Sequence, residues 1–174
     1  MDFISHALIG RIFCFFDKKT KGLNPKINKN WVVIFFAVMP DVVLIPFYAV
    51  LGKENNRFLW IAQNQDWVGS GITHPILTNA YNTTHSIFFA FLIILPIILI
   101  LKIKKSAFFV YLFHIFIDIF THTGEWSIKF LFPLDFNING FTNAWAWPIP
   151  SMAISWIIFS GIILYLNKVY KKKT

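Results

Sequence analysis

Charged residues are scarce in this chain. They make up only 14% of its 174 residues, whereas a soluble globular domain carries about 25%. Hydrophobic residues make up 56% of the sequence and aromatic residues 19%, and a soluble globule of this size has too much surface to bury them all. The composition therefore excludes a soluble globular domain and a disordered chain. It predicts that residues 1–174 form a single integral membrane domain.

Cysteine and glycine-rich motifs are also nearly absent. Cys14 is the single cysteine, so an intramolecular disulfide is excluded and the redox compartment cannot be inferred from it. The sequence contains no GxSxG motif and no glycine-rich phosphate-binding loop. These absences argue against a serine nucleophile of that class and against a P-loop nucleotide site. Any chemistry must come from other polar residues.

Long apolar runs are what the sequence has in abundance. The four best candidates for spans are Trp31–Leu51, Ser86–Leu101, Ala107–Phe120 and Ile149–Leu166. A membrane-spanning helix needs about 17–25 apolar residues. The N-terminal stretch Phe3–Phe16 is shorter and contains Arg11, so it is a span, a half-span or an interfacial helix. We expect an all-α fold, a polytopic membrane helix bundle with four to five membrane helices.

Basic residues gather in three clusters at the ends of these runs. The clusters comprise Lys18, Lys19, Lys21, Lys26 and Lys29, then Lys102, Lys104 and Lys105, and finally Lys168 and Lys171–Lys173. All three fall on one side of the membrane, which the positive-inside rule assigns to the cytoplasm. The sequence predicts a multi-pass protein of the cytoplasmic (inner) membrane with a cytoplasmic C-terminus. The lysines lie beside spans, so the expected partner of the +8 charge is the lipid bilayer and not a nucleic acid.

Three ionisable residues recur every fourth position in the run that precedes the last span. His114, Asp118 and His122 would share one face of a helix. Imidazole and carboxylate are the ligands that a divalent metal ion such as zinc prefers. The alternative is a buried His–Asp hydrogen-bonded network that only packs helices together. Three residues in register favour metal binding, either of a single ion or of two ions that share the carboxylate.

Further ionisable residues lie in or beside the other apolar runs. His6 lies in the first run, Asp41 follows Pro40 within the second, and His85 begins the third. Ionisable residues inside a membrane are costly and mark functional sites. We therefore predict that they join the first group in one layer, with enough ligands for one or two divalent ions, zinc above all. The predicted metal ligands are His6, Asp41, His85, His114, Asp118 and His122.

The same residues carry a resemblance to a known family. The ordered motifs are SH at Ser5, PD at Pro40, THS at Thr84, HxxxDxxTHxGxW from His114, and LFPL up to Leu134. This order resembles the membrane-bound metal-dependent hydrolases, which are also described as LexA-binding, inner membrane-associated hydrolases. The resemblance implies a metal site formed by the six ligands above and a hydrolytic activity.

The chain departs from that family pattern at three positions. Many members read HRGxTHS, with histidine and arginine where this chain has Ala80 and Tyr81, and many have a second aspartate where Val43 stands here. Fewer ligands would mean a single ion or a different substrate site.

The reaction that this ligand set favours is hydrolysis. A metal ion with an open position activates water for attack on an ester or phosphoester, and the reaction also needs an acid or base. We predict Glu125 and Asp118 as the catalytic residues, and a lipid-like substrate near the outer leaflet. The alternative is a non-enzymatic membrane protein, either a small metal transporter or a metal-stabilised scaffold.

Overall fold

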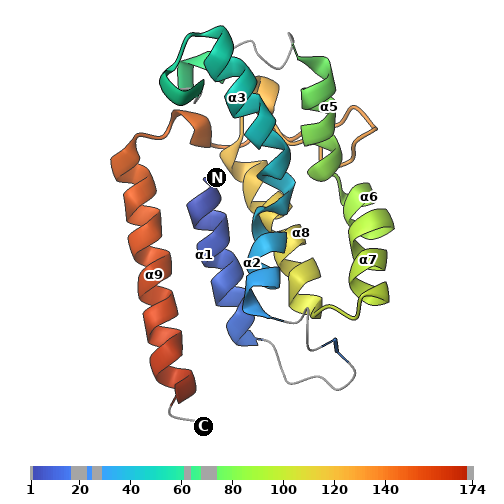
Figure 1. Cartoon of the computed structure of the whole chain (residues 1–174), viewed down its shortest axis with the longest axis vertical. Coiled ribbons are helices and arrows are strands. Elements are labelled where there is room, and N and C mark those ends of the chain that lie inside the picture. The colour runs from blue at the N-terminus through green and yellow to red at the C-terminus, as the bar shows by residue number, and fades with distance from the viewer. Residues whose placement is uncertain (1, 17–22, 25–28, 61–63, 68–73, 172–174) are drawn as a thin grey trace.

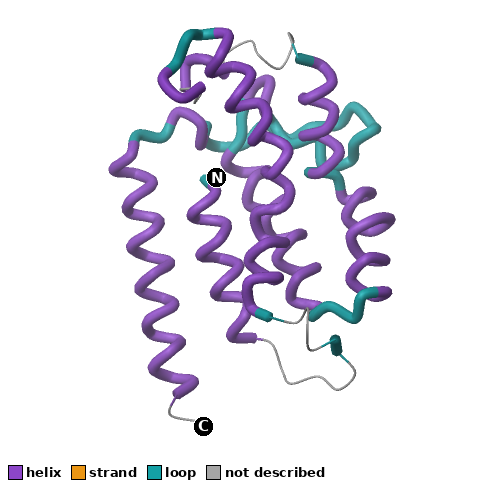
Figure 2. Tube along the Cα trace, viewed as in Figure 1, coloured by secondary structure: helices purple, strands orange, loops and turns teal. Residues whose placement is uncertain are grey.

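The computed structural model describes the chain except for residues 1, 17–22, 25–28, 61–63, 68–73 and 172–174. The described residues form a bundle of helices (Figure 1). Figure 2 shows helices and loops without a strand in this part of the chain, where a single isolated bridge pairs Ile128 with Ile138. The predicted all-α fold is confirmed.

The longer helices follow one another up and down the bundle (Figure 1). The α-helices are α1 (Phe3–Phe13), α2 (Asn30–Val38), α3 (Leu44–Glu54), α5 (Pro75–Thr84), α6 (Ile87–Phe89), α7 (Leu95–Ile100), α8 (Lys105–Thr121) and α9 (Ile149–Lys171). The short segments η1 (Cys14–Phe16), η2 (Met39–Val43), η3 (Phe58–Trp60), η4 (Asn64–Trp67), η6 (Gly124–Trp126) and η7 (Ala144–Ala146) are 3₁₀-helical, and η5 (Ala90–Ile94) is π-helical.

Two of the apolar segments are interrupted helices, and prolines explain the interruptions. Pro40 lies in η2, between α2 and α3; a proline has no N–H for the helical ladder and clashes with the preceding turn. Pro96 follows the π-helical turn η5, which is a usual accommodation of such a residue. A separate bend joins α5 to the helix Ile87–Ile100, and the two meet at an angle of 59°. Ser86 caps the second of these helices.

The number of membrane-spanning helices is lower than expected from the sequence. Among the described residues, two helices are long and apolar enough, Asn30–Glu54 and Ile149–Tyr170, and the bent pair Pro75–Ile100 adds a third if it counts as one span. The expectation of four to five membrane helices is therefore wrong. The reason is length: the helix Phe3–Phe16 and the 17-residue α8 are both below the roughly 18–20 residues that cross a bilayer comfortably.

Helix α1 packs closely against α2 at a glycine. A Cβ atom on Gly10 would lie 2.7 Å from Cβ of Ala37 and 2.9 Å from Cα of Ile34. Only a residue without a side chain permits this approach. His6 lies one turn before Gly10 on the same face of α1, so the contact brings His6 toward the break between α2 and α3.

Helix α9 runs beside α1 at the edge of the bundle (Figure 1). None of its most apolar 18-residue window is buried, as expected for a helix that faces lipid. Two polar contacts join it to the start of α1: Nε1 of Trp156 donates to Asp2 at 2.9 Å, and the hydroxyls of Ser5 and Ser155 lie 3.0 Å apart. These contacts fix the position of α1 along the axis of α9, which is long enough to span the membrane.

The described lysines of the three basic clusters lie at one end of the bundle: Lys29, Lys102, Lys104, Lys105 and Lys168. Helices α1, α7 and α9 end there, and α2 and α8 begin there (Figure 1). Within the described residues, the N–H of Asn24 donates to the carbonyl of Lys102 at 3.3 Å, and Nζ of Lys104 lies 3.4 Å from Oδ1 of Asn30. This end is therefore a single basic surface of the fold.

Alanine scanning of two helical glycines tests the α1–α2 packing. We expect Gly10→Ala to lower the free energy of unfolding by about 1–3 kcal/mol, because the new methyl group overpacks against Ala37. Gly161→Ala in α9 is the matched control, since a Cβ there meets no atom within 4 Å and alanine favours the helix by about 1 kcal/mol. Thermal unfolding in detergent measures both; equal midpoints for the two variants would contradict the close packing.

Candidate metal centre

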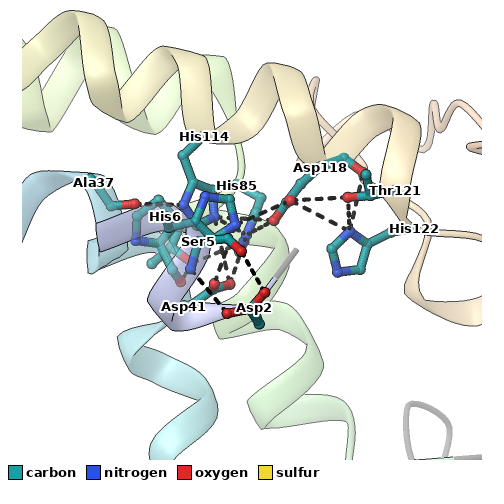
Figure 3. A network of polar contacts seen from close by, with 12 residues as sticks. Asp2, Ser5, His6, Ala37, Asp41, His85, His114, Asp118, Thr121 and His122 are labelled. Atoms are coloured by element: carbon teal, nitrogen blue, oxygen red, sulfur yellow. Dashed lines mark hydrogen bonds and ion pairs between the residues drawn. The ribbon is translucent and has the colours of Figure 1, made fainter. Parts of the chain in front are cut away.

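Five of the residues singled out from the sequence meet inside the bundle (Figure 3). They come from four elements: α1 gives His6, η2 gives Asp41, the end of α5 gives His85, and α8 gives His114 and Asp118. Each of them is at most 3% exposed. Four of them offer ligand atoms that all lie within 4.8 Å of one another: His6, Asp41, His114 and Asp118. This group can hold a metal ion; the ion's identity does not follow from it.

The break between α2 and α3 supplies both a ligand and an anchor. A 3₁₀ turn would pair the carbonyl of Ala37 with the N–H of residue 40, but Pro40 has none. That carbonyl instead accepts a hydrogen bond of 2.7 Å from Nδ1 of His114. Asp41, the next residue in η2, points into the cluster (Figure 3).

The bend between α5 and α6 places the third histidine. His85 caps the C-terminal end of α5, and its Nδ1 donates to the carbonyl of Tyr81 at 2.9 Å. The hydroxyl of the neighbouring Thr84 donates to the carbonyl of Pro40 at 2.8 Å. Tyr111 of α8 donates its hydroxyl hydrogen to the carbonyl of Thr84. The two helix breaks are thus bonded to each other and to α8.

The Nε2 atoms of the histidines and the carboxylate oxygens face a common centre. Nε2 of His114 lies 3.2 Å from Oδ2 of Asp118 and 3.6 Å from Oδ1 of Asp41. Nε2 of His85 lies 3.4 Å from the same Asp41 oxygen. Nε2 of His6 lies 3.3 Å from Oδ1 of Asp118 and 3.9 Å from Oδ2 of Asp41. The distances outline a small cage of nitrogen and oxygen atoms.

The tautomers of two histidines follow from their anchors. Carbonyl oxygens only accept hydrogen bonds, so Nδ1 of His114 and Nδ1 of His85 both carry the hydrogen. In a neutral imidazole the other nitrogen then carries a lone pair. The two Nε2 atoms nevertheless lie 3.2 Å apart, where two lone pairs would repel. A metal ion, or a proton on one of the two nitrogens, removes that conflict, and anchored Nδ1 atoms are the usual second shell of metal-ligating histidines.

The net charge of the cluster and the hydrogen bonding of His6 also favour a bound cation. With neutral histidines the two carboxylates, Asp41 and Asp118, give it a net charge of −2, which is costly to bury without compensation. Nε2 of His6 makes no hydrogen bond to the described residues, although the ring is 1% exposed and stacks on His114 with centroids 3.7 Å apart. A divalent cation would both neutralise the charge and give that nitrogen a partner.

The sixth predicted ligand lies apart from this group. His122 is buried, and its Nδ1 lies 3.2 Å from the carbonyl of Asp118 and 3.8 Å from Oδ1 of that residue. Figure 3 shows it on the far side of Asp118 from the other histidines. The predicted stripe assumes a continuous helix, but α8 ends at Thr121 and His122 has extended backbone angles. His114 and Asp118 both lie within α8, whereas His122 follows the last residue of that helix.

The predicted proton-transfer residue lies at the surface. Glu125 is exposed in the 3₁₀ turn Gly124–Trp126 that follows α8, whereas Asp118 is fully buried in the cluster. His74 contacts Oε2 of Glu54 at 3.1 Å and lies outside the ligand group. Glu125 therefore does not belong to the buried ligand group.

Aromatic side chains continue from the site toward the loop end of the bundle. The ring of Tyr81 lies 4.1 Å from that of His85 and 5.5 Å from that of Trp126, measured between centroids. Trp126 contacts Phe47 and Trp67 and donates its Nε1 hydrogen to the carbonyl of Trp67 at 3.1 Å. Sequence analysis names Tyr81 only as a departure from the family pattern, because only the fold shows that its ring lies against a ligand candidate.

An ion pair holds this aromatic group in place. The guanidinium of Arg57 bonds both oxygens of Asp66, with Nη2–Oδ1 of 2.7 Å and Nε–Oδ2 of 3.0 Å. The hydrogen bonds to this carboxylate raise the pKa of Arg57 above its ordinary value, so the pair stays charged. Asp66 directly precedes Trp67 in the sequence. The ion pair thus lies next to the aromatic residues at the loop end of the site.

Comparisons with known proteins identify the family of the chain but no activity. Neither the curated proteins nor the solved structures include a match. The family described as YdjM inner membrane protein matches residues 1–173. This description supports the expected location in an inner membrane, and it mentions neither hydrolysis nor LexA. By this match over nearly its whole length, the chain belongs to the YdjM inner membrane protein family.

Proposed function

We propose that this protein is a membrane-embedded, metal-dependent hydrolase that binds one divalent ion, zinc above all. The ligands are drawn from His6, Asp41, His85, His114 and Asp118, and hydrolysis requires that one coordination position stays open for water. The observation that carries the proposal is the pair of anchored histidines whose Nε2 atoms face each other at 3.2 Å beside two buried carboxylates. A helix-packing network does not require that arrangement.

Three of the distances between ligand atoms are compatible with zinc, while those from Asp41 to His114 and His6 are longer, at 3.6 and 3.9 Å. Zinc–nitrogen and zinc–oxygen bonds of about 2.0–2.1 Å place neighbouring ligands of a tetrahedral site about 3.3–3.4 Å apart. The contacts of His114 with His85 and with Asp118 are both 3.2 Å, and that of His6 with Asp118 is 3.3 Å. The donor set of imidazole and carboxylate suits the same ion.

The chemistry proposed for the site is the hydrolysis of an ester or phosphoester. A bound divalent ion polarises a carbonyl or phosphoryl oxygen and lowers the pKa of water toward about 7. The water oxygen forms the new bond to phosphorus or carbon, the ester bond breaks, and the leaving oxygen takes up a proton. Asp118 holds the ion, and Glu125, on the turn that follows α8, is our candidate for the proton transfer.

The depth of the site suggests a lipid-like substrate. Ser155, which contacts the first turn of α1, is the seventh residue of α9, so it lies about 9 Å along the axis from the start of that helix. This is within one leaflet, because half of the hydrocarbon core is about 15 Å thick. His6 follows Ser5 directly. An apolar, lipid-like molecule partitions to that depth, and it would have to bring its ester or phosphoester below the headgroup layer to reach the site.

We further propose that this leaflet is the outer one and that the C-terminus is cytoplasmic. The support is the single basic end of the bundle, which the positive-inside rule places in the cytoplasm. Cysteine labelling in intact spheroplasts tests it in a Cys14→Ser background. An impermeant maleimide should label Phe58→Cys, an exposed position beyond α3, before lysis and Lys168→Cys only after lysis. The reverse pattern would overturn the orientation.

Metal analysis of purified protein tests the site itself. Wild-type protein in detergent should carry one equivalent of zinc or another divalent transition metal. His114→Ala and Asp118→Ala should each lower the content by more than about tenfold, since even the partners of ligands contribute 10–100-fold to affinity. His74→Ala, which removes a histidine outside the group, is the control. His122→Ala should also keep its ion, whereas loss of half the metal would reveal two ions.

Absence of metal from folded wild-type protein after reconstitution would refute the site. The His–Asp group would then be a network that packs the helices.

Hydrolysis of short-chain phospholipids and carboxylic esters in mixed micelles tests the reaction. We expect turnover by the metal-loaded wild type and loss of turnover on chelation. Glu125→Gln should lower kcat by about 100-fold or more, the usual effect of removing a general acid or base, while the metal content stays unchanged. An unchanged kcat would exclude Glu125. A fully loaded protein without turnover of either substrate class would instead favour metal transport or a metal-stabilised scaffold.

A further inference from the structure

The hydroxyl of Tyr81 is buried and has no hydrogen-bond partner among the described residues. The residue is 1% exposed. Buried tyrosine hydroxyls nearly always have a partner, and each exception calls for a specific explanation. The Tyr81 hydroxyl can donate one hydrogen bond and accept others. The fold thus keeps a polar atom available that the chain itself does not use.

Tyr81 lies directly against the proposed metal site. Its ring is tilted by 39° on that of His85, with centroids 4.1 Å apart, and its carbonyl anchors Nδ1 of His85. The phenol is also within electrostatic range of Asp41 and Asp118. Trp126 covers it edge-on from the loop side. These contacts fix the ring against a ligand while the hydroxyl stays without a bond.

A second buried tyrosine shows that the missing partner is particular to Tyr81. Tyr111 is 0% exposed, and its hydroxyl donates to the carbonyl of Thr84, the residue next to His85. The fold therefore does satisfy a tyrosine hydroxyl in the same neighbourhood. The hydroxyl of Tyr81 differs in having no such partner among the described residues, although its ring packs on the ligand candidate His85.

We propose that the hydroxyl of Tyr81 donates a hydrogen bond to a substrate oxygen at the metal site, on the phosphoryl or carboxyl group that is hydrolysed. This inference rests on the proposed function. A neutral donor suits the position, because it bonds an oxygen that carries negative charge without adding a cation that would compete with the metal. Tyr81 is then a substrate-binding residue and contributes no ligand to the ion.

Phosphate binding to the zinc-loaded protein tests the proposal with two matched variants. Tyr81→Phe removes a hydroxyl without a partner in the chain, and Tyr111→Phe removes one that is bonded. Zinc affinity, thermal midpoint and the affinity for inorganic phosphate are measured for each. We expect Tyr81→Phe to keep the zinc affinity and midpoint of wild type and to weaken phosphate binding by about tenfold, as loss of one charge-assisted hydrogen bond does. Tyr111→Phe should lower the midpoint.

The outcomes separate this inference from the function on which it rests. Unchanged phosphate affinity in Tyr81→Phe overturns the inference while metal binding by the wild type leaves the proposed site intact. A drop in the thermal midpoint as large as that of Tyr111→Phe assigns the hydroxyl a structural role and also overturns it. Failure of the wild type to bind zinc removes the proposed function and the inference together.

Discussion

Two carboxylates buried in an apolar bundle are the constraint on which the rest of this structure depends. Asp41 and Asp118 are at most 3% exposed, and an apolar environment penalises each of them heavily unless positive charge and hydrogen bonds compensate. Three imidazole rings from three different elements surround them. The close packing of α1 on α2 at Gly10 and the hydrogen bond from Thr84 to Pro40 both serve to bring those rings within reach.

The interrupted helices follow from the same constraint. In a bilayer, backbone groups released from a helix must find partners within the protein. Here the partners are the polar residues of the site: the carbonyl of Ala37 bonds His114, and that of Tyr81 bonds His85. A carbonyl beside each break thus anchors a histidine, and the carbonyl of Tyr81 also keeps its helical bond from the N–H of His85 at 3.1 Å. The irregular backbone and the polar cluster stabilise one another.

Much of the candidate site could be predicted from the sequence, but its geometry could not. The four-residue spacing of His114 and Asp118 predicts a shared helical face correctly. The same reasoning fails to place His122, because α8 ends one residue earlier, at Thr121. The sequence overestimates the number of spans because Phe3–Phe16 and Ala107–Phe120 are apolar, yet the helices they form are too short to cross a bilayer. The role of Tyr81 depends on contacts between α5 and its neighbours, which no local pattern encodes.

The ligands come from positions far apart in the chain, from His6 at one end to Asp118 well past the middle. Nascent chains emerge from the ribosome N-terminus first, so the cage does not exist until α8 has been made and has entered the bundle. An ion in this site is therefore acquired only after insertion into the membrane. Metal binding would then stabilise the bundle only after it has assembled. The two carboxylates must enter the membrane before metal neutralises them.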